Sequence, residues 1–311
     1  MLRRPASRAL LVAVVPAALV LAGCGSGSGT GSNGGATPTI VVTYSILGDV
    51  VRQLVGDAAT VRVIIPNGQD PHEYEPSAKD VEAIQHAGLV VENGLDLEEG
   101  LAAVLEQASA DGVDTFVATD HITVRALGAG DPADDHGDVG GSGTDPHFWT
   151  DPLTVRELAP DLSATLERVL GVQLDDRLAA FEQAMTTLDE QIREIMAAIP
   201  AGGCELVTGH DSLGYFARRY GCTLIGAVVP SLSSSAETSA QALSQLHDAA
   251  QHANVRAVFT EVGTPKQIAE QVADEVGVPL VELPSHNLPD TGGYAAYMTD
   301  LATRIATALS S

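Results

Sequence analysis

Residues 170–199 read LGVQLDDRLAAFEQAMTTLDEQIREIMAAI, and this stretch decides the fold. Apolar residues recur in it at every third or fourth position, at Leu174, Leu178, Phe181, Met185, Leu188, Ile192, Ile195 and Met196. No Gly or Pro interrupts the stretch between Val172 and Ile199. The spacing predicts one amphipathic helix of about 25 residues. So long a helix in the middle of the chain indicates a rigid backbone that joins two lobes.

Strands alternate with helices on both sides of this helix. Short β-branched runs predict strands at 40–44, 60–65, 89–92, 205–208, 224–228, 257–260 and 280–283. Helical patterns between the first of these runs lie near 47–55 and 77–86. Such alternation predicts parallel βαβ units. The expected fold is therefore α/β, with two lobes of mostly parallel sheet at 39–168 and 201–311, a linking helix at 169–200, and a ligand cleft between the lobes.

The N-terminus carries an export signal at residues 1–23. A basic start is followed by an apolar run of 13 residues at 9–21, which is short of the about 20 residues that a membrane span needs. The run ends in Leu21-Ala22-Gly23-Cys24, which resembles a bacterial lipobox. That resemblance implies that Cys24 is lipidated and becomes the first residue of the mature protein. The plain alternative is an ordinary signal peptide followed by an incidental cysteine.

Residues 24–38 form a tether after the signal. The stretch 25–38 reads GSGSGTGSNGGATP, a composition that cannot form a packed core and that spans roughly 20 Å as a flexible chain. Two further cysteines, Cys204 and Cys222, each lie at the start of a strand-like run. Because the chain is exported, a disulfide between them is chemically allowed. The alternative is a pair of buried free thiols.

The charge of the chain excludes one class of function. The sequence has 16 Lys and Arg against 41 Asp and Glu, a formal net charge of −25. So acidic a surface repels nucleic-acid phosphates and disfavours direct docking on anionic lipid. It attracts cations, although solubility alone could also account for it.

Four of the nine histidines follow or adjoin strand ends, and they are His72, His147, His210 and His286. Two come from each half of the chain. Four imidazoles that converge on a cleft would make a tetrahedral nitrogen site, which suits Zn²⁺. Their spacing along the chain does not by itself establish that they converge.

Three segments around these histidines resemble, in order, the ligand motifs of a known family, the metal-binding solute-binding lipoproteins of ABC importers for zinc and manganese. They are DPHEYEP at 70–76, DPHFWTDP at 145–152 and GHDSLGYF at 209–216. The resemblance covers about residues 39–308 and includes the long helix and the lipobox. It implies a metal held between two lobes, with two ligands from each. It also implies delivery to a membrane permease with a cytoplasmic ATPase behind it, and a monomer anchored by lipid on the extracytoplasmic side of the cell membrane.

The fourth ligand departs from the family pattern. In the family it is usually an Asp after the last strand, and the segment LPSHNL at 283–288 has His286 in that place. Glu261 or Asp290 could supply a carboxylate instead. The resemblance also implies a metal preference. The family's manganese and iron members typically have a Glu as the third metal ligand, where this chain has His210. Because hard cations prefer oxygen donors, the nitrogen-rich set favours Zn²⁺ over Mn²⁺.

Acidic residues next to the motifs are expected to support the metal. Glu73, Asp211 or Glu261 could accept hydrogen bonds from the ring N–H groups of the histidines. The Gly- and Asp-rich loop at 128–144, with His136, Asp134 and Asp135, is interpreted as a weak, mobile lure for cations. The alternative for this loop is a disordered linker without a role.

Three rival functions remain at this point. A zinc hydrolase needs an open coordination position and a general base, as in HExxH. The sequence has no HExxH, and four ligands would close the site, so no enzyme is expected. The other rivals are a manganese-specific or broad transition-metal binding protein of the same family, and a surface adhesin or interaction lipoprotein.

Overall fold

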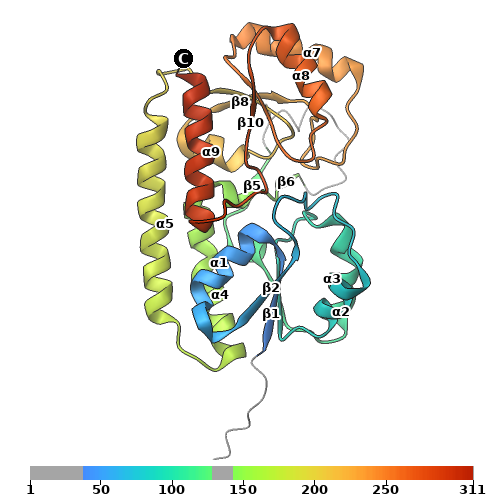
Figure 1. Cartoon of the computed structure of the whole chain (residues 1–311), viewed down its shortest axis with the longest axis vertical. Coiled ribbons are helices and arrows are strands. Elements are labelled where there is room, and N and C mark those ends of the chain that lie inside the picture. The colour runs from blue at the N-terminus through green and yellow to red at the C-terminus, as the bar shows by residue number, and fades with distance from the viewer. Residues whose placement is uncertain (1–37, 128–142, 311) are drawn as a thin grey trace, which may run out of the picture. The chain divides into compact units, whose positions relative to one another are not determined.

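A computed structural model describes residues 38–127 and 143–310 of the chain (Figure 1). The predicted signal, Cys24, almost all of the tether, and the loop residues His136, Asp134 and Asp135 lie outside the described residues. The first half of the described chain contains β1 (Thr39–Tyr44), α1 (Ser45–Val55), β2 (Thr60–Ile65), α2 (Ala78–Gln85), β3 (Leu89–Glu92), α3 (Ala102–Ala110), β4 (Thr115–Val117), β5 (Arg125–Ala126) and β6 (Thr144–Asp145). The second half contains α4 (Pro152–Leu170), α5 (Asp175–Met196), β7 (Glu205–Thr208), α6 (Gly214–Tyr220), β8 (Thr223–Ala227), α7 (Ala240–Ala253), β9 (Val258–Thr260), α8 (Lys266–Val276), β10 (Leu280–Glu282) and α9 (Gly293–Leu309).

The first sheet is parallel, with strand order β2-β1-β3-β4. Strand β1 lies in its interior, where Ile40 pairs with both Val61 and Leu89. An interior strand of a parallel sheet is covered on both faces, which is why β1 is a continuous apolar run without alternation. The first half therefore forms the α/β unit that the βαβ pattern predicts.

The second sheet repeats this arrangement with strand order β10-β9-β7-β8, again parallel. Strands β7 and β9 lie inside it, and Val207 pairs with Val258 between them. The α/β fold with two mostly parallel sheets is therefore confirmed. The ends of the parallel strands β2, β7 and β10 supply the loops of three histidines, as expected for an open α/β sheet. The fourth, His147, follows β6, which pairs with β5 in a separate antiparallel sheet.

The long helix is present but is shorter than the predicted range 169–200. Helix α4 ends at Leu170, and Gly171 follows in the left-handed conformation with φ of 68°. The side chain of Glu167 then accepts a hydrogen bond from the backbone N–H of Leu174 at 2.6 Å. This turn separates α4 from α5, so α5 has 22 residues and starts at Asp175. A left-handed glycine at this point is a common helix ending.

Helix α5 packs against α1, α4 and the C-terminal helix α9, beside which it runs in Figure 1. Two bonds tie α9 to the first half of the chain. The backbone N–H of Tyr294 donates to Asp49 at 2.9 Å, and the Tyr294 hydroxyl donates to the carbonyl of Trp149 at 2.7 Å. The two sheets are thus joined by a packed pair of helices, α5 and α9, and by the loops that meet at the histidines.

The structure pairs Cys204 with Cys222 in a disulfide, with a Cα–Cα distance of 4.6 Å. Cys204 immediately precedes β7 and Cys222 immediately precedes β8. Since these strands are parallel neighbours, their first residues lie side by side.

Candidate metal centre

Four loops bring the histidines to one region of the molecule. His72 follows β2, His147 follows β6, His210 follows β7 and His286 follows β10. All four are buried, with exposed fractions of 5 %, 0 %, 0 % and 3 % in that order. Burying a polar ring is costly unless its nitrogens find partners, so the partners of each ring determine what the site can do.

Three of the imidazoles converge through the same ring atom. The Nε2 of His147 lies 3.3 Å from the Nε2 of His72 and 3.1 Å from the Nε2 of His210. The ligand atoms of all three residues lie within 4.8 Å of one another. A tetrahedral zinc with Zn–N bonds of 2.0–2.1 Å has N···N edges of about 3.3 Å. The edges from His147 to His72 and from His147 to His210 therefore have the length expected in a tetrahedral metal site.

A carboxylate faces the other nitrogen of each of these rings. The Nδ1 atoms of His72, His147 and His210 lie 3.4 Å from Glu99, 2.8 Å from Asp145 and 2.7 Å from Glu261, respectively. Among the described residues the contact at His147 is a hydrogen bond, whereas the Nδ1 atoms of His72 and His210 have close carboxylates without hydrogen-bond geometry. A carboxylate at Nδ1 favours the proton on that nitrogen and leaves the lone pair of Nε2 for a metal. The sequence prediction named Glu261 for this role, whereas Glu99 and Asp145 were missed.

The motif Asp-Pro-His occurs twice, at 70–72 and 145–147, and builds the same turn each time. Asp70 accepts a hydrogen bond from the backbone N–H of His72 at 3.0 Å, and Asp145 accepts one from that of His147 at 2.9 Å. In the second copy the same carboxylate oxygen also faces the ring. This repeated spacing is the local signal that could have identified Asp145, whereas Glu99 has no such signal.

Burial and neighbouring charges shift the pKa values of the ionisable groups around the histidines. Burial would raise the pKa of Glu261, but the charge and hydrogen bonds of His210 outweigh it and lower that pKa to about 2. Burial raises the pKa of Asp145 to about 6, against the hydrogen bond from His147 and the charge of Arg125, whose guanidinium lies 3.2 Å away. Burial also lowers the pKa of His147, and His210 and His72 add to this effect. A neutral His147 is the form that binds a metal.

His286 lies near Trp149 but outside the group of described ligand atoms that lie within 4.8 Å of one another. Its ring centroid is 5.6 Å from that of Trp149, which is itself 5.3 Å from the ring of His147. Burial lowers the pKa of His286 to about 4. Within the described part of the chain neither of its ring nitrogens has a hydrogen-bond partner. A buried imidazole with both nitrogens unpaired is costly, and a bound cation would relieve that cost.

The other acidic residues that the sequence suggested for the site differ in exposure to solvent. Glu73 and Asp290 are exposed, whereas Asp211 is buried. Coulombic interaction with Asp211 contributes to the raised pKa of His210, after the burial that lowers it and the larger opposing effect of Glu261. The structure thus brings His72, His147 and His210 together, with Glu261 next to them.

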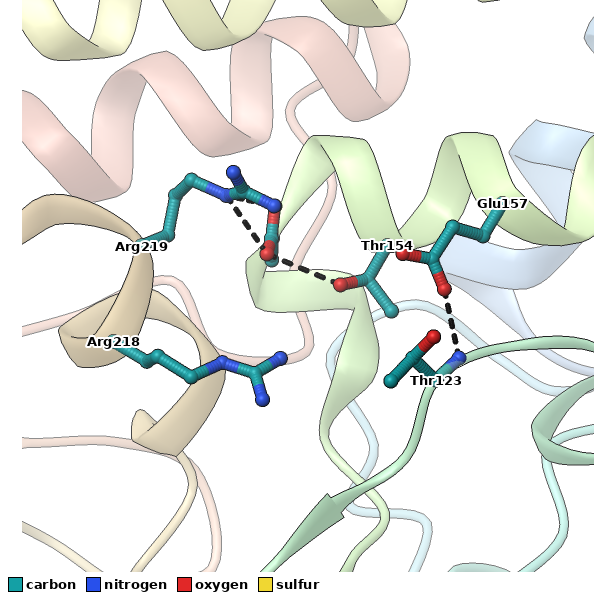
Figure 2. Close-up of a pocket in the computed structure, with 6 residues that line it drawn as sticks. Thr123, Thr154, Glu157, Arg218 and Arg219 are labelled. Carbon is teal, nitrogen blue, oxygen red and sulfur yellow. Dashed lines mark hydrogen bonds and ion pairs between the residues drawn. The ribbon is translucent and has the colours of Figure 1, made fainter.

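A separate pocket of about 290 Å³ lies where α4 approaches α6 (Figure 2). Arg219 donates to Asp151 at 2.9 Å there, and the backbone N–H of Thr123 donates to Glu157 at 2.7 Å. The residues that line the pocket are Thr123, Asp151, Thr154, Glu157, Arg218 and Arg219. Two guanidinium groups make this pocket unsuitable for a cation, so the metal chemistry belongs to the histidine cluster.

Two parallel α/β sheets, a long linking helix and a buried imidazole cluster define a metal-binding protein of the two-lobed class. The chain belongs to the family described as "Zinc-uptake complex component A periplasmic", whose model matches residues 40–308. Members are metal-binding substrate-binding proteins of ABC transporters and are not enzymes. The resemblance expected from the sequence motifs is thereby confirmed.

Relatives of this chain differ in the metal that their names give. The "Manganese-binding lipoprotein MntA" of Halalkalibacterium halodurans is 31 % identical over 266 residues, which are 85 % of this chain and 84 % of that protein. The "Zinc-binding protein TroA" of Treponema pallidum is 26 % identical over 245 residues, 77 % of this chain and 75 % of that protein. The solved structure of TroA covers 88 % of this chain and 100 % of its own, with a TM-score of 0.74 at 26 % identity.

The ABC-transporter family implies a permease and an ATPase as partners. None of the helices within 38–127 and 143–310 combines the length and apolar character needed to cross a membrane.

Proposed function

We propose that this protein captures Zn²⁺ with His72, His147, His210 and His286 and delivers it to an ABC permease for zinc uptake. The observation that carries the proposal is the convergence of three Nε2 atoms, with 3.1 and 3.3 Å between neighbours. Each ring has a carboxylate at its other nitrogen. Imidazole nitrogens suit Zn²⁺, whereas Mn²⁺ prefers oxygen donors.

His286 is the fourth ligand in this proposal. It is buried next to the cluster with both ring nitrogens unpaired among the described residues. The two alternative ligands are less suitable. Both oxygens of Glu261 accept from the hydroxyl of Ser212, at 2.9 and 3.0 Å, and Oε1 also lies at the Nδ1 of His210. Asp290 is exposed. With His286 the site has two ligands from each lobe, 39–168 and 201–311.

A manganese carrier of the same family is the second candidate. It is favoured by the relative that is 31 % identical and named for manganese. Buried carboxylates also lie around the cluster, at Asp70 and Glu261. These oxygens would have to turn from their present partners, Ser234 and His210, to reach a metal. That cost favours the nitrogen set and therefore zinc.

The location of the protein completes the proposal. Lipid on Cys24 would hold a monomer on the extracytoplasmic side of the cell membrane, and the 24–38 tether would let it reach the permease. Relatives are named as lipoproteins, which supports this placement. Glu73 and Asp211 are proposed as further acceptors for the ring N–H groups of the ligands, and the loop with His136, Asp134 and Asp135 as a weak lure for cations.

The test is a competitive titration with a chromophoric chelator on the metal-free, unlipidated form, residues 25–311. The wild type is expected to bind one Zn²⁺ tightly and Mn²⁺ much more weakly. His286→Ala should weaken zinc binding, whereas the matched change Asp290→Ala, at an exposed position, should leave it unchanged. Equal affinities in His286→Ala and the wild type would move the fourth ligand elsewhere. Preference for Mn²⁺ in the wild type would contradict the assignment of zinc.

A further inference from the structure

One loop of the second lobe contacts both ligand-bearing regions. Residues 231–235, with the sequence SLSSS, follow strand β8, and we call them the serine loop. At its start the carbonyl of Ser231 accepts a hydrogen bond from the backbone N–H of Asp211 at 2.9 Å. Asp211 directly follows His210 in the sequence. The serine loop is therefore anchored to the segment that carries a histidine of the second lobe.

The other end of the serine loop reaches carboxylates of the first lobe. The hydroxyl of Ser234 donates to Asp70 at 2.6 Å, and both side chains are buried. The hydroxyl of Ser233 donates to Oε1 of Glu99, and that of Ser235 approaches Oε2 of Glu99 at 3.4 Å. Three consecutive serines thus join residues that are more than 130 positions away in the sequence.

These two carboxylates also hold His72. The other oxygen of Asp70 accepts from the backbone N–H of His72 at 3.0 Å, and Oε1 of Glu99 lies 3.4 Å from its Nδ1. The main chain and the ring of this ligand are therefore positioned by the same groups that the serines contact. A shift of the serine loop must change the surroundings of His72 through Asp70 and Glu99.

The close approach at Asp70 requires a glycine on its far side. Gly263 has φ of +88°, and a Cβ added there would overlap Oδ2 of Asp70 and lie 3.0 Å from Cβ of Ser234. The carboxylate of Asp70 is thus seated between Ser234 and the backbone of Gly263, both from the second lobe. This seat exists when the two lobes are together.

We propose that Ser233, Ser234 and Ser235 form an interlobe latch that couples the retention of metal to lobe closure. The inference rests on the proposed function, since it deepens the role of the same site. A cation on Nε2 makes the Nδ1–H of His72 more positive, and this attracts the carboxylate of Glu99, which lies 3.4 Å from that nitrogen. Metal on His72 therefore fixes Glu99 in the position that the serines need, and by reciprocity the latched loop retains the metal. The serines are positioning residues, because they act through Asp70 and Glu99.

Hydroxyl donors suit a metal carrier that must also release its metal. Each contact joins a neutral hydroxyl to a carboxylate, with no ion pair between the lobes at this point. A permease that separates the lobes would break a few such bonds without separating opposite charges. Metal release is then governed by the latch, and metal entry is not.

Stopped-flow kinetics on the unlipidated form, residues 25–311, test the latch. Zn²⁺ association is followed by the fluorescence of Trp149, the single tryptophan of the chain, and dissociation by transfer to a chromophoric chelator. Ser234→Ala is expected to speed dissociation about 10-fold, which is about 1.4 kcal/mol, with the association rate unchanged. The matched control is Ser244→Ala, an exposed serine in α7, which should change neither rate. Gly263→Ala should reproduce the fast dissociation, because its Cβ displaces Asp70.

Three results would overturn the proposal, and one separates it from the proposed function. Unchanged dissociation in Ser234→Ala would show that the serines do not retain metal. Equal acceleration of association and dissociation would mean that the loop holds the lobes together whether or not metal is bound. A lowered melting temperature of metal-free Ser234→Ala with an unchanged ratio of the two rates would assign Ser234 a merely structural role. A wild type that binds no zinc would instead refute the proposed function itself.

Discussion

Replacing Glu261 by Gln tests how much the carboxylate behind a ligand contributes to metal affinity. Glu261 lies 2.7 Å from Nδ1 of His210, accepts from the backbone N–H of His210 at 3.1 Å, and accepts from the hydroxyl of Ser212. The substitution keeps the size of the side chain and removes its charge. The ring of His210 would then donate to a neutral amide.

The magnitude follows from the strength of the two kinds of hydrogen bond. A bond to a charged group stabilises by about 1.5–3 kcal/mol and a neutral one by about 0.5–1.5 kcal/mol. The exchange therefore costs about 1–1.5 kcal/mol, or about 10-fold in the Kd for Zn²⁺. This lies at the lower end of the 10–100-fold losses that are typical of groups that orient metal ligands.

The assay is chelator competition at pH 7 with Glu270→Gln, an exposed position in α8, as the matched control. Circular dichroism of the metal-free variants checks that both fold. If Glu261→Gln binds Zn²⁺ as tightly as the control does, the buried carboxylate contributes nothing to His210 as a metal ligand.

Three further outcomes follow from the structure. The folded protein holds the pKa of His286 at about 4 against an ordinary 6.5, so between these values the unfolded chain binds more protons and the stability of the metal-free protein falls as the pH falls; His286→Gln should show a shallower fall in thermal melts from pH 7 to pH 4. Substituting Cys204 and Cys222, which form a disulfide across 18 positions, should lower the free energy of unfolding by about 3 kcal/mol in urea titrations. The wild type with its disulfide chemically reduced should lose the same free energy of unfolding. Saturating Zn²⁺ should change the emission of Trp149, whose ring lies 5.3 Å from that of His147, whereas His147→Ala should abolish that change.

The strands were predictable because buried parallel strands are continuous apolar runs. The runs at 60–65, 89–92 and 205–208 coincide with β2, β3 and β7. Strands β4, β5 and β6 were missed. The start of the linking helix was placed too early, at 169, because the predicted range included the end of α4 and the turn at Gly171.

The site was predictable as far as local sequence positions it. His72 and His147 could be named from the repeated Asp-Pro-His motif, and His210 and His286 from their place after parallel strands, which end at a common edge of a sheet. Glu99 and Ser234 could not be named. Their contacts join segments more than 100 positions apart in the chain, and neither residue has a distinctive neighbour in the sequence. Such partners follow from the packing of the lobes.

X-ray absorption on protein loaded from an equimolar mixture of Zn²⁺ and Mn²⁺ tests whether the four histidines bind zinc. One measurement then gives both the identity of the bound metal and its ligands. A site of four histidines should give one zinc per chain, with four nitrogen ligands at 2.0–2.1 Å and the outer-shell scattering of imidazole. Bound manganese, or a zinc site dominated by oxygen ligands, would contradict the claim that four histidines form a zinc site.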